Sequence, residues 1–236
     1  MKIYHTHRAI LVLESPWELD NQDANRSSVI PFINGVAKLA GDTEVFHANF
    51  YDKNSFEKAL ECLCKTTFEN TTVYIAAHGY KKKAGNVKIS DVLRLIGDKS
   101  KKYNITGLML GACFVGENTI TMEVYIEGTN LKWCAGYSSS TYWLPGTLID
   151  CSILSRMSEL ELDDFEDRDT LIYSLADAIS PFSNLFNIGL DYNEKPVSLE
   201  DSMQFVVQPS GKGYKAKKVN EDVLKIWHSL QCSKAQ

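Results

Sequence analysis

The fold is decided by the stretch TTVYIAAHGY at residues 71–80, in which an apolar run leads directly into a histidine and a glycine. A second stretch, NITGLMLGACFVG at residues 104–116, repeats the pattern with a cysteine in place of the histidine. Short apolar runs of this kind are typical of strands buried inside a parallel sheet. The two stretches therefore predict two buried strands, at 72–77 and 105–111, each with a chemically reactive side chain just past its end.

Strands and helices alternate around these two stretches. Further strands are expected at 9–14, 44–48 and 132–137. Helices are expected between the strands, at 29–39, 55–68, 90–96 and 147–160. Asn54 or Ser55 is the expected N-terminal cap of the second helix. This alternation predicts an α/β fold, a mostly parallel central sheet covered by helices on both faces.

The last third of the chain has a weaker pattern. A helix is expected at 168–179, a hairpin from 203–207 and 214–219, and a final helix at 221–230. No repeat, low-complexity tract or linker divides the 236 residues, which predicts a single domain over residues 1–236.

Composition excludes several classes of protein. The net charge of −5 gives no reason to expect direct binding to nucleic acid. No apolar run approaches the roughly 20 residues that a membrane span needs, so no membrane association is expected. The N-terminal stretch MKIYHTHRAILVLE lacks a signal-peptide cleavage pattern, and a cytoplasmic location is therefore predicted.

The six cysteines are expected to be free thiols in that compartment. Cys62 and Cys64 have no second cysteine pair at a zinc-ribbon spacing, and nothing near His5 and His7 completes a metal site. Neither a metal nor a cofactor is therefore expected. A flavodoxin-like nucleotide binder is a weak alternative, because no glycine-rich phosphate loop follows the first strand.

His78 and Cys113 each follow a predicted strand of the same sheet. Active sites of open α/β sheets gather at the carboxyl ends of strands, and neighbouring strands lie about 4.8 Å apart. The imidazole can stabilise a thiolate nucleophile or take its proton, and it can later protonate a leaving amine. Taken singly, the histidine could be a turn residue and the cysteine a core residue; together they favour a catalytic pair.

The segments VYIAAHGY and GLMLGACFVG resemble the motifs of the caspase-like (clan CD) cysteine peptidases. This superfamily includes caspases, metacaspases, clostripain-like enzymes, separase and CHAT-domain proteases. The resemblance covers about residues 8–160 and includes CAGYSSSTYW at 134–143; residues 161–236 have no assigned role. It implies a caspase-like three-layer sandwich and a cysteine endopeptidase that cleaves a protein or peptide substrate through an acyl-enzyme.

Carried over to this sequence, the resemblance makes Cys113 the nucleophile and His78 the general acid and base. The backbone amides of Gly79 and Cys113 would hold the oxyanion. Candidate substrate-binding residues are Arg26 and the segment of Ser138, Ser139, Ser140, Thr141 and Tyr142.

The sequence also departs from the caspases. Ala112 stands where caspases have a glutamine, and the pocket segment has no second arginine, so specificity for aspartate is not expected. Cleavage after lysine or arginine would need a carboxylate in the pocket, for which Asp150 or the pair Asp163 and Asp164 could serve.

The chain between Cys113 and the next predicted strand is too short for a caspase-style processing linker. Control by a regulatory protein or ligand is therefore expected, and small stand-alone members of the superfamily suggest a role in bacterial antiviral defence or cell death. The alternative is a catalytically silent caspase-like module that serves as a scaffold for a partner.

Overall fold

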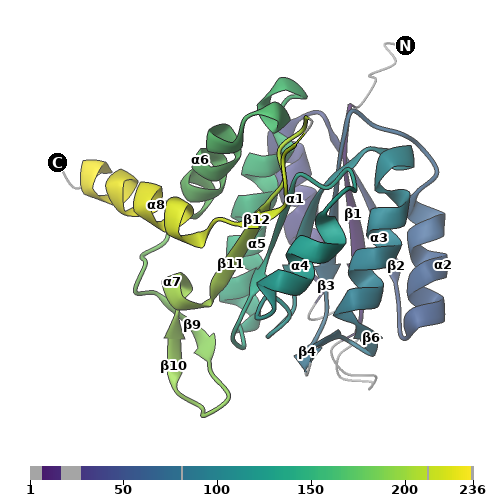
Figure 1. Cartoon of the computed structure of the whole chain (residues 1–236). Coiled ribbons are helices and arrows are strands. Elements are labelled where there is room, and N and C mark those ends of the chain that lie inside the picture. The colour runs from purple at the N-terminus through teal and green to yellow at the C-terminus, as the bar shows by residue number, and fades with distance from the viewer. Residues whose placement is uncertain (1–6, 17–27, 81, 212, 235–236) are drawn as a thin grey trace.

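The central sheet has seven strands among the residues that this computed structural model describes, 7–16, 28–80, 82–211 and 213–234. Their order is β12-β11-β8-β7-β3-β1-β2 (Figure 1). The parallel strands are β1 (Arg8–Glu14), β2 (Thr43–Asn49), β3 (Asn70–Ala76), β7 (Ile105–Gly111) and β8 (Trp133–Tyr137). The antiparallel pair β11 (Met203–Val207) and β12 (Lys217–Lys218) completes one side.

Helices cover both faces of the sheet. One face carries α1 (Ile30–Ala40), α5 (Trp143–Ser158), α6 (Arg168–Ile179) and α8 (Asn220–Lys234). The other carries α2 (Lys53–Leu63), α3 (Ile89–Tyr103) and α4 (Thr119–Ile126). Successive strand side chains point to opposite faces, so Ile10 and Val12 join the first core while Leu11 and Leu13 join the second. The predicted three-layer α/β sandwich with a mostly parallel sheet is confirmed.

Several element boundaries differ from the expectation. The helix expected at 90–96 is α3, which has 15 residues because amphipathic spacing continues through the lysine-rich segment. Helix α5 begins at Trp143, not at 147, because Pro145 is tolerated in a first turn. Neither Asn54 nor Ser55 is the cap of α2; Asp52 is, and its side chain accepts a hydrogen bond from the Ser55 amide.

Seven short elements were not expected, together with α4. They are β4 (Gly79–Tyr80), β5 (Lys83–Ala84), β6 (Val87–Lys88), η1 (Asp163–Glu166), β9 (Asn187–Leu190), β10 (Pro196–Ser198) and α7 (Leu199–Ser202). The small β4–β6 sheet and the β9–β10 hairpin both lie at the lower end of Figure 1, where the parallel strands end. These two additions therefore border the carboxyl edge of the main sheet.

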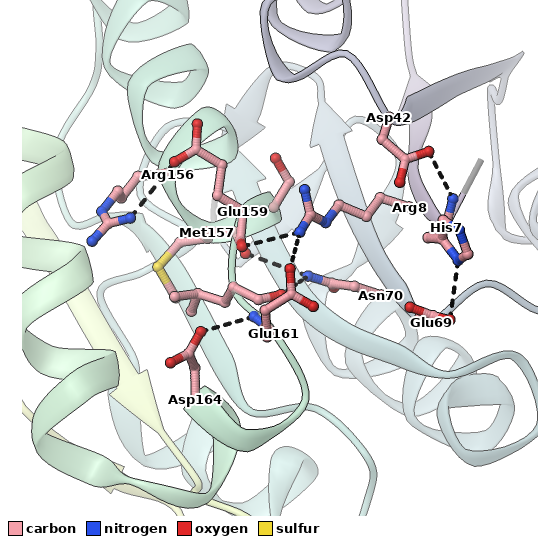
Figure 2. A network of polar contacts seen from close by, with 12 residues as sticks. His7, Arg8, Asp42, Glu69, Asn70, Arg156, Met157, Glu159, Glu161 and Asp164 are labelled. Carbon is pink, nitrogen blue, oxygen red and sulfur yellow. Dashed lines mark hydrogen bonds and ion pairs between the residues drawn. The ribbon is translucent and has the colours of Figure 1, made fainter. Parts of the chain in front are cut away.

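At the opposite edge of the sheet, the amino edge where the parallel strands begin, polar contacts join strands to the end of α5 and the segment after it (Figure 2). The Arg8 guanidinium contacts the Glu161 carboxylate at 2.5 Å and donates to the Glu159 carbonyl at 3.2 Å. The Asn70 amide donates to the carbonyls of Met157 and Leu160 at 3.5 and 3.3 Å. These bonds attach the end of α5 to β1 and β3, and they occupy the amino edge with structural contacts.

Residues after 160 contribute to the same sheet and core. Strand β11 pairs with β8, and Phe165, Leu175 and Trp227 are buried in the cluster that also contains Trp133. The segment that lies outside the resemblance to the peptidases therefore completes one side of the sheet and one of its covering layers.

Candidate active site

Strand register brings the sequence positions of His78 and Cys113 together. Strands β3 and β7 are neighbours, and Ala76 pairs with Gly111. His78 and Cys113 each stand two residues beyond this pair, so the two neighbouring strands expected from the sequence are present. His78 is exposed and Cys113 is half-buried.

Gly79 lies directly against the backbone of Cys113. A Cβ placed on Gly79 would come within 1.7 Å of the Cys113 carbonyl oxygen and 2.3 Å of its nitrogen, so no other residue fits without a backbone shift. Strand β4 begins at this glycine and pairs with Ala84. The small sheet β4–β6 thus holds the segment after His78 against the segment that carries the cysteine.

Backbone amides surround the sulfur of Cys113. The Thr141 amide donates to Sγ at 3.3 Å, and the amides of Gly79 and Cys113 also act on the thiol. Burial raises the pKa of the thiol above its ordinary value, these three amides lower it, and the nearby Asp150 raises it. The site therefore offers several N–H groups that can stabilise negative charge on the sulfur or on an oxygen beside it.

A narrow pocket adjoins the cysteine. Its volume is about 20 Å³, and Val29, Tyr142 and Trp143 line it together with Cys113 and Asp150. Asp150 is 3% exposed, and its two carboxylate oxygens accept hydrogen bonds from Tyr137 at 2.6 Å and from Tyr74 at 2.7 Å. A pocket of this volume holds about one water molecule.

The carboxyl of Asp150 is buried, and among the described residues it forms no ion pair with a basic side chain. Burial raises its pKa to about 7, against the lowering effect of the two tyrosine hydroxyls. Gly111 leaves room for it, because a Cβ there would come within 2.6 Å of an Asp150 oxygen. The pocket thus contains an acid that changes charge near neutral pH and interacts best with a cationic group.

The three predicted pocket serines contact the C-terminal part of the chain. Ser138 donates to the Ser202 carbonyl at 2.9 Å, and the hydroxyls of Ser139 and Ser202 lie 2.7 Å apart. Ser140 forms bonds with Leu190 through both its amide and its hydroxyl. None of the three serines lines the pocket described above, whereas Tyr142 does.

Other predicted positions lie elsewhere. Arg26 falls outside the described residues. Asp163 is exposed and Asp164 half-buried in η1, next to the amino edge, where Asp164 accepts a bond from the Glu161 amide (Figure 2). Only Asp150, among the described acids considered for a basic substrate, lines the pocket beside Cys113.

Sequence reasoning missed Tyr74 and Tyr137, and for Thr141, which lies in the segment 138–142 considered for the pocket, it missed the role of the amide. The two tyrosines sit inside predicted strands, and only the folded arrangement shows their hydroxyls on Asp150. Thr141 follows directly after the serines, and an alternation of backbone direction along this segment could have identified its amide as the one that faces the cysteine.

In the described part of the chain, no group of three or more histidine, cysteine, aspartate or glutamate side chains could hold a metal ion. None of the helices found there has the length and apolar composition needed to cross a membrane.

No family model matches the chain, and no curated protein matches its sequence. Among solved structures, the chain is similar to a secreted C11 cysteine protease from Bacteroides thetaiotaomicron, called iotapain, with a TM-score of 0.49 and 9% sequence identity. The similarity covers 86% of this chain and 66% of that one, so this chain spans just under two thirds of the protease.

Proposed function

We propose that the protein is a caspase-like cysteine endopeptidase in which Cys113 is the nucleophile and His78 the general acid and base. The observation that carries the proposal is the register of β3 and β7, in which Ala76 pairs with Gly111 and both side chains follow two residues later. The close contact between Gly79 and the Cys113 backbone supports it, because it brings together the two amides that we propose as donors to the oxyanion.

The reaction proceeds in two balanced steps. His78 accepts the thiol proton of Cys113, and the thiolate attacks the carbonyl carbon of the scissile peptide bond. The C–N bond then breaks, the amine leaves with the proton from the imidazolium, and a thioester remains on the cysteine. Water, deprotonated by the imidazole, attacks the thioester and releases a carboxylic acid and the free thiol.

The substrate class follows from Asp150. A lysine or arginine side chain on the acyl side of the scissile bond would enter the pocket beside Cys113 and pair with this carboxylate, while Tyr142 contacts the substrate at the rim. Pairing would favour the ionised carboxylate, which compensates for its burial. The serines at 138–140 support the rim through their contacts with Ser202 and Leu190.

Regulation by a partner or ligand is part of the proposal. The pocket has room for about one water molecule, so a lysine or arginine side chain could enter only if Tyr142, Trp143 or Val29 moves. A ligand that binds only the open pocket would shift the population toward the active form.

The test is cleavage of a peptide library by the wild-type protein and by Cys113→Ala, with mass-spectrometric identification of the products. Cuts after lysine or arginine that are present only with the wild type support the proposal. Cys62→Ala, at an exposed cysteine, is the matched control and should cleave normally. Cuts made equally by the wild type and by Cys113→Ala would refute the role of Cys113.

The role of Asp150 has a separate test. Asp150→Asn should lower kcat/KM for basic substrates by about a hundredfold, because a cationic side chain would be buried without its partner charge. Asp163→Asn, at an exposed acid far from the pocket, should leave kcat/KM unchanged.

The narrow pocket also favours a second candidate, a catalytically silent module that binds a partner. A peptide electrophile directed at thiols separates the two functions, because a competent site reacts at Cys113 faster than an exposed thiol such as Cys62. Reaction at Cys62 alone would favour the scaffold.

A further inference from the structure

The backbone bends sharply at Phe114, directly after Cys113. Phe114 has a φ of 61°, in the left-handed region that residues with a Cβ avoid. Phenylalanine has no intrinsic preference for this backbone conformation, so contacts with surrounding residues must stabilise the conformation. One such contact is the Phe114 amide, which donates to the Ser139 carbonyl at 2.9 Å.

The second contact comes from a remote part of the chain. The ring of Tyr192 stacks on the ring of Phe114, with centroids 4.1 Å apart and planes inclined by 17°. The Tyr192 hydroxyl donates to Glu117 at 3.1 Å, so both ends of its side chain bind the segment that follows Cys113. Tyr192 is 57% exposed, which means that this stack, not burial in a core, fixes its ring.

Tyr192 stands at the tip of the β9–β10 hairpin, where hydrogen bonds within residues 191–195 close the turn. Asp191 accepts hydrogen bonds from the amides of Asn193 and Lys195 at 2.7 and 2.9 Å. Its own amide donates to the Lys195 carbonyl at 2.9 Å. These bonds fix the backbone of the turn that carries Tyr192.

The other end of the hairpin holds the segment on the opposite side of the sulfur. The amides of Ser140 and Tyr142 donate to the carbonyls of Leu190 and Ile188 at 2.9 and 2.7 Å. Thr141, between them, turns its amide the other way and donates to Cys113 Sγ at 3.3 Å. Strand β9 thus fixes the Thr141 amide while the hairpin tip fixes Phe114.

We propose that the β9–β10 hairpin sets the position of the Cys113 thiol, with Tyr192 as the positioning residue that keeps Phe114 in its left-handed conformation. Loss of the tyrosine ring would let Phe114 relax to a negative φ and move Cys113 relative to the Gly79 and Thr141 amides. The nucleophilic use of that thiol rests on the proposed function, whereas the positioning itself does not. Residues 187–198, beyond the limit of the peptidase resemblance, then belong to the active site.

The test is the rate at which iodoacetamide alkylates Cys113, followed residue by residue with mass spectrometry across pH 5–9. Tyr192→Ala should slow the reaction about tenfold and raise its pH midpoint, because fewer amides would face the thiolate. Tyr192→Phe keeps the ring and should stay near the wild-type rate. Tyr173→Ala, at a half-exposed tyrosine on α6, is the control for removal of a surface ring.

A double-mutant cycle separates positioning from a general loss of structure. Glycine adopts the conformation of residue 114 without steric conflict. In a Phe114→Gly background, Tyr192→Ala should therefore change the alkylation rate by less than about threefold. Equal loss in both backgrounds, or an unchanged rate and midpoint in Tyr192→Ala alone, would overturn the inference.

Peptidase assays on the same variants distinguish this inference from the proposed function. If the wild type cleaves peptides and Tyr192→Ala is equally active and equally alkylated, only the positioning role is refuted. A wild-type protein whose cuts all persist in Cys113→Ala, with alkylation still dependent on Tyr192, retains the positioning role and removes the proposed peptidase.

Discussion

Gly79 is the residue at which a single methyl group should disrupt the site. In Gly79→Ala the added Cβ would lie 1.7 Å from the Cys113 carbonyl oxygen, a backbone atom that cannot turn aside. We expect the free energy of unfolding to fall by about 1–3 kcal/mol, as for other overpacked positions, and the alkylation of Cys113 to slow. Urea unfolding and iodoacetamide labelling measure the two effects.

Gly35 offers the matched control. It lies inside α1, and a Cβ there would meet nothing within 4 Å. Gly35→Ala should therefore raise the free energy of unfolding by up to about 1 kcal/mol through helix propensity, with no change at Cys113. Equal effects of the two substitutions would show that Gly79 is not a point of close backbone contact.

Asp150 should make stability depend on pH. Its pKa is raised from 3.8 to about 7, so between these values the folded protein holds a proton that the unfolded chain has lost. Rising pH then favours the unfolded chain, and this group should lower the free energy of unfolding by up to about 4 kcal/mol over that window. Below pH 4 and above pH 7 its contribution is constant.

Asp150→Asn keeps the size of the side chain and removes its titration. Urea unfolding at several pH values from 4 to 8 should show a smaller fall in stability for this variant than for the wild type. The exposed Asp163→Asn should behave like the wild type. If the free energy of unfolding falls with pH as steeply in Asp150→Asn as in the wild type, the carboxyl ionises normally in the folded protein.

Single residues were predictable from the sequence where a motif identifies them. His78, Gly79 and Cys113 follow apolar runs, and the order of the runs predicts neighbouring strands. Asp150 entered only as one of several acids, because the pairing of a helix residue with tyrosines from two strands is a tertiary event. The bend at Phe114 has no sequence signature at all, since an aromatic residue disfavours it.

The start of helix α2 is stabilised by side chains from its own sequence. Asp52 and Ser55 form a capping box, with the Ser55 amide 2.8 Å from the Asp52 carboxylate and the Asp52 amide 2.9 Å from the Ser55 hydroxyl. Asp52→Ala should lower Tm by a few degrees, because the Ser55 amide in the first turn loses its side-chain acceptor. Asn54→Ala should lower Tm far less. Circular dichroism on heating measures Tm for both variants.

Buried parallel strands were the most predictable elements, because both faces select apolar residues; β7 was predicted with its observed bounds. Helix α6 was equally predictable from its spacing. The β9–β10 hairpin was missed because its strands are short, half-exposed and rich in turn residues. Its position depends on hydrogen bonds to residues 140–142, which no local pattern encodes.

At the scale of the whole molecule, residues 161–236 should be required for folding. Without them β8 would lose its partner β11, and the cluster around Trp133 would lose Phe165, Leu175 and Trp227. A chain of residues 1–160 should therefore show no cooperative urea transition and little near-ultraviolet circular dichroism, because several large apolar surfaces would be exposed to water.

Adding the complementary fragment 161–236 provides the control for truncation itself. If the two parts form one core, mixing them should restore a single transition, since the contact between Arg8 and Glu161 and the β8–β11 pairing need no covalent link. A cooperative transition of 1–160 alone would contradict the prediction of one domain. In that case the β9–β10 hairpin would belong to a separable unit, and Tyr192 would act on Cys113 across an interface between two domains.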